Sequence, residues 1–143
     1  TFCELAQAVT GILCLKERGL DGRELAQFAR AAKHMYLPQE RDGLCEQQDG
    51  FFDKDLRAAD TLDPAERPLN QHWSWDRILR SCFIKQADVL QGMYCLRHLY
   101  SDEVIRRNFL YYEPMTVHES SLSPCVHAIL AAQVGESGKA MEM

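Results

Sequence analysis

The stretch DEVIRRNFLYYEPMTVHESSLSPCVHAIL, residues 102–130, decides the fold class of this chain. Its first part, 102–112, begins with two acidic side chains, which suit the positive end of a helix dipole. Ser101 stands directly before it as an N-cap residue, and Pro114 ends it because proline cannot continue a helix. The stretch therefore opens with a helix whose two ends are both marked.

The second part of the same stretch predicts another helix. Ser123 and Pro124 are expected at the N-cap and the first helical position, where a Ser-Pro pair commonly stands. The apolar run 124–134 follows, and Gly135 closes it as glycine does at a helix C-terminus. We therefore expect two helices joined by a polar loop.

Apolar residues recur at helical spacing elsewhere in the chain. The runs are 2–18, 22–36 and 85–100, with a possible short helix within 73–84. The first two are expected to form an antiparallel helical hairpin, since only a short glycine-containing turn separates them. Strand signal is nearly absent, so the predicted class is all-α.

The segment 37–72 is different, because it shows little sustained periodicity. It carries three of the five prolines, together with many Asp and Gln residues. One short strand is possible within 43–52. An irregular segment of this length inside a compact domain is more often functional than idle.

The totals describe ordinary globular material. A chain of 143 residues suits one domain, and 46% hydrophobic with 26% charged residues is a globular composition. A net charge of −5 argues against a nucleic-acid partner, which usually requires a basic face. No apolar run reaches the roughly 18 residues of a membrane span, and no leader pattern indicates secretion.

The six cysteines are interpreted as free thiols. No two of them form a CxxC pair, and most stand among apolar neighbours, where cysteine behaves as a small hydrophobic residue. Free thiols are typical of a reducing compartment, so the expected location is the cytoplasm. Neither structural zinc nor another metal is expected.

The loop before the second helix has the parts of an anion pocket. A helix N-terminus offers unpaired N–H groups and partial positive charge, and the hydroxyls of Ser120 and Ser121 and the ring of His118 can add donors. On spacing alone, simple helix capping is the stronger interpretation of the serines, because Ser-Pro is also a common way to begin a helix. Glu119 weakens the anion interpretation unless it points away.

A second candidate site lies at residues 85–88, KQAD. A lysine is not favoured at a helix start by the dipole, which invites a functional interpretation. Lys85 and Gln86 can donate to the hydroxyls of a polar ligand, and one of two tryptophans, Trp73 or Trp75, can supply a flat apolar face. The alternative is a solvated first turn with Asp88 as the dipole partner.

These two motifs together resemble glycoside hydrolase family 65, the maltose, trehalose, kojibiose and nigerose phosphorylases. The residues that carry the resemblance are IKQADVLQGMY, 84–94, and RRNFLYYEPMTVHESSLSPCVHAILAAQVG, 106–135. EQQDGFF, 46–52, is similar to a Gln…Asp-Gly-Phe loop of the family, though less specifically. The resemblance implies a partial (α/α)6 barrel of about five helices, with 1–143 as the C-terminal part of a single catalytic domain.

The resemblance also implies a reaction. Inorganic phosphate attacks the anomeric carbon of an α-glucoside with inversion, and the products are β-glucose 1-phosphate and a sugar; no cofactor is needed. Lys85 and Gln86 would bind the glucosyl hydroxyls, and three residues would line the phosphate site, namely His118, Ser120 and Ser121. The full-length enzyme is expected to be a homodimer with disaccharide and phosphate as its ligands.

The general acid of the family is a glutamate expected upstream of Thr1, so no catalytic residue is assigned within 1–143, and this chain alone is expected to be inactive. Two alternatives remain. One is a trehalose or α-glucoside hydrolase of the same fold, which would activate water with a carboxylate. The other is a non-catalytic helical interaction module that uses 37–72 as a binding loop.

Overall fold

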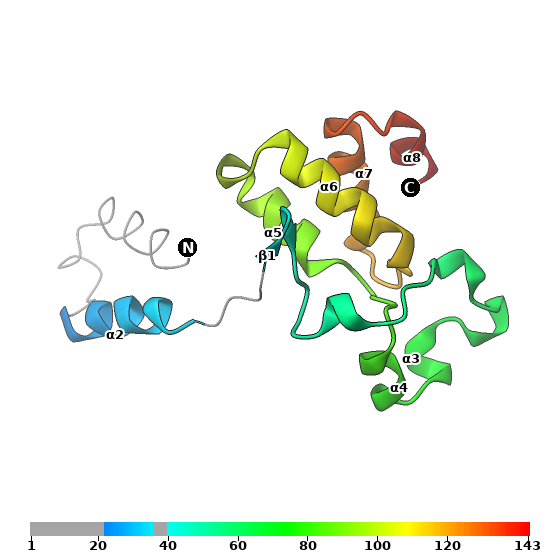
Figure 1. Cartoon of the computed structure of the whole chain (residues 1–143), viewed down its shortest axis with the longest axis horizontal. Coiled ribbons are helices and arrows are strands. Elements are labelled where there is room, and N and C mark those ends of the chain that lie inside the picture. The colour runs from blue at the N-terminus through cyan, green and yellow to red at the C-terminus, as the bar shows by residue number, and fades with distance from the viewer. Residues whose placement is uncertain (1–21, 36–39) are drawn as a thin grey trace. The chain divides into compact units, whose positions relative to one another are not determined.

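The computed structural model of the chain describes residues 22–35 and 40–143 (Figure 1). The chain divides into two compact units, Thr1–Leu37 and Pro38–Met143, and each is described by itself. In the first unit, helix α2, Gly22–Lys33, begins where the sequence predicts and ends three residues earlier than predicted. The helix predicted over 2–18, and with it the helical hairpin, lies outside the described residues.

The second unit starts with a small β-hairpin. Strands β1, Glu40–Arg41, and β2, Leu44–Cys45, pair antiparallel, with Arg41 opposite Leu44. The two residues of the turn, Asp42 and Gly43, both have positive φ, at 52° and 78°. This is the conformation that an Asp-Gly pair favours in a two-residue hairpin. The short strand expected within 43–52 is therefore confirmed as β2.

The rest of the predicted irregular segment consists of short turns and helices. They are η2 Phe51–Asp53, η3 Ala59–Thr61, η4 Pro64–Glu66 and α3 Leu69–His72. The short helix predicted within 73–84 is α4, Trp75–Arg80. Ser74 caps α4, because its hydroxyl accepts a hydrogen bond from the backbone N–H of Arg77 at 3.3 Å.

The next predicted helix, 85–100, is wrong at both ends. Helix α5 covers Asp88–Cys95, and a separate 3-10 turn, η5, covers Arg97–Leu99. Lys85 and Gln86 therefore precede the helix instead of opening it. Helix α6, Asp102–Tyr112, has the predicted bounds, and the Ser101 hydroxyl accepts from the N–H of Val104 at 3.3 Å, as a cap does. The turn η6, Glu113–Met115, follows.

Helix α7, Ser123–Gln133, corrects a second expectation. Its N-cap residue is Leu122, which provides no side-chain cap, and Ser123 is already helical. The Ser123 hydroxyl is instead 2.9 Å from Nδ1 of His118, so it does not serve the helix end. The predicted end is confirmed, since Gly135 has φ +85° directly after the last turn. The final helix, α8, covers Ser137–Glu142.

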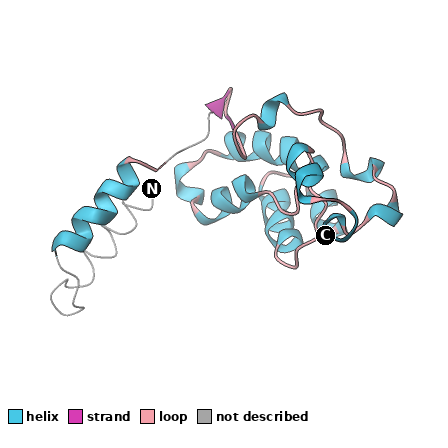
Figure 2. Cartoon of the chain, turned by 90° about the horizontal axis from the view of Figure 1, so that it is seen from below, coloured by secondary structure: helices cyan, strands magenta, loops and turns pink. Residues whose placement is uncertain are grey.

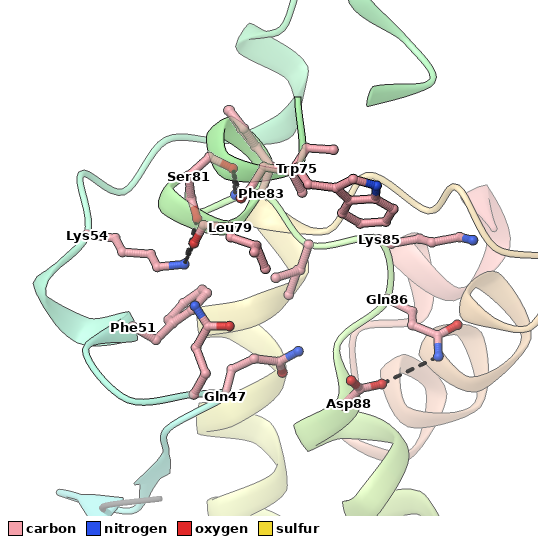
Figure 3. Close-up of a pocket in the computed structure, with 13 residues that line it drawn as sticks. Gln47, Phe51, Lys54, Trp75, Leu79, Ser81, Phe83, Lys85, Gln86 and Asp88 are labelled. Carbon is pink, nitrogen blue, oxygen red and sulfur yellow. Dashed lines mark hydrogen bonds between the residues drawn. The ribbon is translucent and has the colours of Figure 1, made fainter. Parts of the chain in front are cut away.

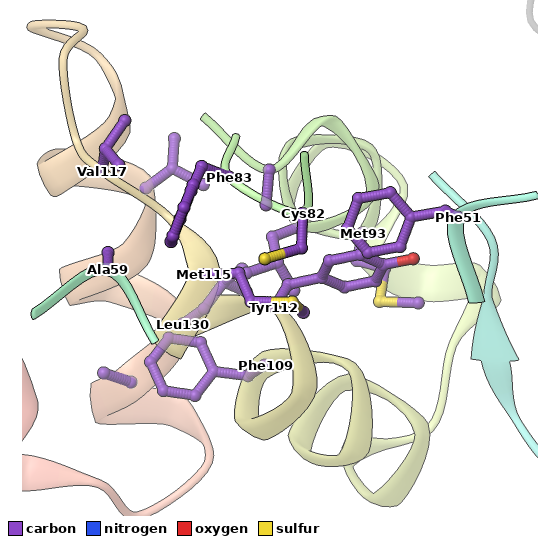
Figure 4. Packing of buried hydrophobic residues seen from close by; sticks show 14 of the residues in the cluster. Phe51, Ala59, Cys82, Phe83, Met93, Phe109, Tyr112, Met115, Val117 and Leu130 are labelled. Atoms are coloured by element: carbon purple, nitrogen blue, oxygen red, sulfur yellow. The ribbon is translucent and has the colours of Figure 1, made fainter. Parts of the chain in front are cut away.

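Helices α5, α6 and α7 contact one another pairwise, and α8 packs against α7. Figure 4 shows the core that they enclose, with Phe109, Tyr112, Met93 and Leu130 fully buried. The hairpin attaches to α6 through Tyr112, whose hydroxyl donates to the carbonyl oxygen of Cys45. Burial raises the pKa of that hydroxyl, so it remains a donor.

The described residues confirm the all-α class: seven α-helices are joined by loops and turns, and strand is confined to the hairpin (Figure 2). Within 22–35 and 40–143, none of the helices combines the length and the apolar composition that a membrane crossing requires. The cysteines in this part of the chain carry free thiols, as expected; they are Cys45, Cys82, Cys95 and Cys125.

Candidate functional site

A short backbone pairing brings the two motifs together. Residues Ile84 and Thr116 form a parallel bridge, in which the N–H of Ile84 donates to Met115 O at 3.1 Å and the N–H of Val117 donates to Ile84 O at 2.8 Å. The chain continues in the same direction on both sides of the bridge. The two segments that follow the bridge, one with Lys85 and the other with His118, therefore start side by side.

Lys85 and Gln86 lie in the wall of a cavity of about 420 Å³, called here the Lys85 cavity (Figure 3). Lys85 is exposed and has no hydrogen-bond or ion-pair partner in the described part of the chain. Gln86 Nε2 is 3.4 Å from Asp88 Oδ1. Other polar side chains of the wall are Gln47, Gln48 and Lys54. A wall that combines cationic, amide and carboxylate groups suits a ligand with many hydroxyls.

Gln47 is a residue of this wall that sequence reasoning left without a role. Its Oε1 accepts a hydrogen bond from the backbone N–H of Val89 at 3.3 Å, which ties the loop after the hairpin to the first turn of α5. Lys54 serves the structure instead: its ammonium donates to the carbonyl oxygens of Leu79 and Ser81 at 2.7 and 2.9 Å. The similarity of EQQDGFF to the family loop was the available signal for Gln47.

The structure distinguishes the two tryptophans. Trp73 is buried, its indole N–H donates to Glu66 Oε1 at 2.9 Å, and the guanidinium of Arg77 lies 3.5 Å from its ring centroid. Both contacts of Trp73, the hydrogen bond of its indole and the cation–π contact of its ring, therefore serve the structure. Trp75 is 73% exposed and lines the Lys85 cavity, and Figure 3 shows its ring beside Lys85. Of the two, Trp75 is the available flat face.

His118 occupies a constrained position. Its φ is +52°, in the left-handed region that few side chains other than glycine adopt. Both ring nitrogens have partners: Nδ1 lies 2.9 Å from Ser123 Oγ, and Nε2 lies 3.3 Å from Glu113 Oε1. The imidazole therefore has no unoccupied nitrogen to offer a ligand in this conformation.

The three residues after His118 have separate environments. Glu119 points away from the serines, since it accepts from the N–H of Leu69 at 2.9 and 3.0 Å and lies 3.7 Å from Arg67. Ser120 accepts from the N–H of Leu122 at 3.4 Å. Ser121 is exposed and makes no hydrogen bond within the described residues. The condition for an anion pocket, that Glu119 points away, is met.

Glu113, which sequence reasoning missed, is the centre of a buried polar cluster. One carboxylate oxygen faces His118, and the other is hydrogen-bonded to Nδ1 of His127. Lys139 of α8 places its ammonium 3.4 Å from Oε1. Burial raises the pKa of Glu113, but hydrogen bonds and charge from the two histidines outweigh burial and lower this pKa to about 2. Glu113 is therefore ionised at neutral pH.

A signal for Glu113 was present in the sequence. A glutamate directly after a helix lies at the negative end of the dipole, where it is disfavoured unless other groups stabilise it. His127 stands inside the apolar run of the second predicted helix, where a buried histidine needs a partner. It is buried and pairs with Glu113, whereas its Nε2 has no hydrogen-bond partner among the described residues.

The predicted phosphate and sugar residues do not share one cavity. His118 lines a second cavity of about 410 Å³, together with Arg67, Asp60 and Lys139, and neither Ser120 nor Ser121 lines it or the Lys85 cavity. A third, of about 270 Å³, has residues of both motifs in its wall; these are Lys85, Val117 and Glu119, with Trp75 beside them.

Glu113, His118 and His127 could in principle hold a metal ion, because one donor atom from each lies within 4.8 Å of the others. The ammonium of Lys139 lies 3.4 Å from the same carboxylate and would repel a second cation. The hydrogen bonds from the histidines already occupy both carboxylate oxygens. The donor set thus fits a charge-paired cluster better than a metal centre.

Comparison with known proteins identifies the class and then the family. The class that the matching family model defines is a glycosyl hydrolase catalytic domain. The model of the glycosyl hydrolase family 65 central catalytic domain matches residues 3–143, so the chain belongs to that family, as the two motifs predict.

Individual relatives agree with this assignment. The chain is 55% identical over 140 residues to a maltose phosphorylase of Bacillus subtilis (strain 168), covering 96% of this chain and 18% of the relative. It is 36% identical over 138 residues to a kojibiose phosphorylase of Halothermothrix orenii, covering 96% and 17%.

A solved structure described as a candidate kojibiose phosphorylase from human microbiome matches with a TM-score of 0.74 at 39% identity, covering 88% of this chain and 17% of that one. The chain spans under a fifth of the length of these relatives.

Proposed function

We propose that this chain supplies the sugar and phosphate contacts of an inverting disaccharide phosphorylase. The observation that carries the proposal is the bridge between Ile84 and Thr116, which sets the glucosyl-binding motif beside the phosphate-binding motif. Phosphate must lie against the anomeric carbon in order to attack it, so the two sites have to be adjacent. The bridge meets this requirement, because it makes two motifs that are separated in the sequence adjacent in the fold.

On the sugar side, Lys85 and Gln86 donate hydrogen bonds to hydroxyls of the glucosyl unit that is transferred. The exposed ammonium of Lys85 supports this role, because it has no partner to give up among the residues that the structure describes. Trp75 offers its exposed face to a sugar ring, and Gln47 adds an amide to the same wall.

On the phosphate side, the occupied ring of His118 changes the expected division of roles. Ser121, just before α7, makes no hydrogen bond in the described part of the chain, and Ser120 lies beside it, so these hydroxyls are the direct donors to phosphate in this proposal. Serines are neutral donors and cannot deprotonate water, which suits a phosphate nucleophile better than a hydrolytic water.

In the reaction, a phosphate oxygen forms the new bond to the anomeric carbon while the bond from that carbon to the glycosidic oxygen breaks. The departing oxygen takes a proton from a carboxylic acid outside this chain, and the configuration inverts. Phosphate itself is the nucleophile, so no general base is required. Inorganic phosphate is a co-substrate, and the proposal includes no cofactor.

Maltose is the proposed disaccharide. The relative named a maltose phosphorylase is 55% identical, whereas relatives with kojibiose, trehalose or nigerose in their names are 31–37% identical. The free thiols support a reducing cytoplasmic location. We further propose that residues 1–143 are the C-terminal part of one (α/α)6 barrel in a homodimeric enzyme.

The test uses the full-length protein with maltose, in the presence and absence of inorganic phosphate. Phosphate-dependent formation of β-glucose 1-phosphate, with the configuration of its anomeric carbon determined by NMR, is the expected result. Release of glucose without phosphate would indicate the hydrolase. No cleavage of any of the named disaccharides would favour the interaction module.

A further inference from the structure

We propose that Glu113 is a positioning residue for phosphate binding: together with Ser123, it clamps the ring of His118 and so fixes the turn that presents Ser120 and Ser121. This inference rests on the proposed phosphorylase function. It assigns Glu113 no contact with phosphate or with the sugar. The residue acts through His118.

The first part of the argument is the geometry of the clamp. The His118 ring is held from two sides by two elements, Ser123 at the start of α7 and Glu113 in η6 at the end of α6. The distances are 2.9 Å to Ser123 Oγ and 3.3 Å to Glu113 Oε1. Two contacts on opposite nitrogens leave the ring one orientation, because rotation breaks both of them.

The second part is the backbone at His118. Its φ of +52° is unfavourable for a residue with a Cβ atom, so surrounding contacts must hold it. The ring contacts are one such restraint, and they act together with the hydrogen bonds of Val117 and Glu119 on either side. A left-handed residue reverses the direction of the chain, and here the reversal carries the chain directly into Glu119, Ser120 and Ser121. The ring of His118 thus contributes to holding the turn that leads to the two serines.

The third part is the support of Glu113 itself. Its side chain is 8% exposed and is an acceptor only, so both histidines must present N–H groups to it: Nε2–H from His118 and Nδ1–H from His127. Lys139 supplies the balancing positive charge. His127 packs its ring against that of His118, with centroids 4.7 Å apart and an interplanar angle of 83°. The clamp is rigid because its anchor is held on three sides.

The experiment measures the KM for phosphate and the KM for maltose separately in the full-length enzyme. Glu113→Ala is expected to raise the KM for phosphate at least about tenfold and to leave the KM for maltose within about twofold, since misplacing a binding turn acts on its own ligand. Glu113→Gln is the rescue variant. Its amide can still accept from His118, because the unpartnered Nε2 of His127 can take the proton that Nδ1 gives up.

A double-mutant cycle tests whether Glu113 acts through His118. The phosphate KM of the Glu113→Ala/His118→Ala protein should equal that of His118→Ala alone. Multiplicative effects of the two substitutions would overturn the inference. So would an unchanged phosphate KM in Glu113→Ala, or failure of Glu113→Gln to restore it.

Met115→Ala is the matched control. Met115 is buried two positions after Glu113, and it makes no hydrogen bond to the His118 ring. Its replacement should therefore lower the stability of the protein, while the ratio of the two KM values stays unchanged. If Glu113→Ala does not fold, Ser123→Ala releases the other side of the ring, and an unchanged phosphate KM in it overturns the clamp. A wild-type enzyme that needs no phosphate would instead refute the proposed function, before any variant is made.

Discussion

The backbone N–H of Val117 donates a hydrogen bond to the carbonyl oxygen of Ile84, with 2.8 Å between the two atoms. Each residue stands next to a group assigned to a ligand, Ile84 before Lys85 and Val117 before His118. The pairing uses backbone groups only, so it leaves the exposed side chain of Lys85 available. This contact sets the two segments side by side.

Lys85→Ala is predicted to lower kcat/KM for the disaccharide about 10- to 100-fold, because a hydrogen bond from a charged donor contributes about 1.5–3 kcal/mol. The free energy of unfolding should change by less than about 0.5 kcal/mol, since Lys85 is exposed and unpaired among the described residues. Steady-state kinetics and denaturant unfolding of the full-length enzyme measure the two effects.

Arg80→Ala is the control for Lys85. It removes another cation, on the exposed side of α4, where Arg80 pairs with Asp76 at 2.9 Å outside the Lys85 cavity. Its kcat/KM should match that of the wild type. An equal loss in both variants would mean that overall charge, and not a contact with the sugar, explains the effect.

The two tryptophans are predicted to respond in opposite ways. Trp73→Ala should cost about 3–5 kcal/mol of stability, because it empties a buried site and leaves Glu66 without its indole donor. Trp75→Ala should leave stability nearly unchanged and raise the KM for the disaccharide by up to about tenfold, the scale of one lost ring-stacking contact. A destabilised Trp75→Ala protein with normal KM would contradict the assignment.

Glu113 is predicted to make the free energy of unfolding depend on pH in the acidic range. Its pKa is lowered from 4.5 to about 2 in the folded protein, so the stabilisation is complete above pH 4.5 and is lost as the pH falls toward 2. At about 1.4 kcal/mol per pH unit, the contribution is of the order of 3 kcal/mol. The difference in unfolding free energy between wild type and Glu113→Gln should be largest at neutral pH and shrink between pH 5 and 2, measured by urea unfolding at constant ionic strength. A constant difference across that range would contradict it.

Asn108→Ala is predicted to detach the hairpin from α6. The Asn108 amide accepts from the N–H of Cys45 at 2.9 Å and donates to the carbonyl oxygen of Gly43 at 2.7 Å, in a fully buried position. Leaving these groups unpaired should cost about 2–4 kcal/mol. Because Gln47 follows the hairpin closely, the KM for the disaccharide should rise as well.

Arg106→Ala tests the specificity of that effect. Arg106 lies on the same helix and pairs with Glu136 at 2.9 Å, at a partly exposed position. Its loss should cost less than about 1 kcal/mol and leave the KM unchanged. If both variants raise the KM equally, α6 as a whole and not the hairpin contact is responsible.

Local sequence signals predicted those parts of the fold that local interactions decide. The bounds of α6 follow from Ser101 and Pro114, and the end of α7 follows from Gly135; no other segment has to be present for these to act. The all-α class follows for the same reason. Two of the errors have tertiary causes. The start of α5 moves to Asp88 because the backbone of Ile84 pairs with residues 115–117, and the Ser123 hydroxyl leaves the helix end for the ring of His118.

The candidate site divides in the same way. The sequence shows both motifs, the one with Lys85 and Gln86 and the one with His118, Ser120 and Ser121. It does not show that the two motifs are neighbours, because this depends on one bridge between positions far apart in the chain. Glu113 and His127 become partners only when η6 and α7 fold against each other. The choice between Trp73 and Trp75 likewise required knowing which of the two the core covers.

The bridge between Ile84 and Thr116 also limits how the chain can change in length. It closes the segment between them into a loop that contains two helices, α5 and α6. One residue inserted inside either helix would turn everything beyond it by about 100° and lift it by 1.5 Å, so the edges of the bridge would no longer meet. Insertions and deletions should therefore be accepted at the turn between Cys95 and Asp102, and the helices on either side should keep a fixed count of residues in any working descendant of this sequence.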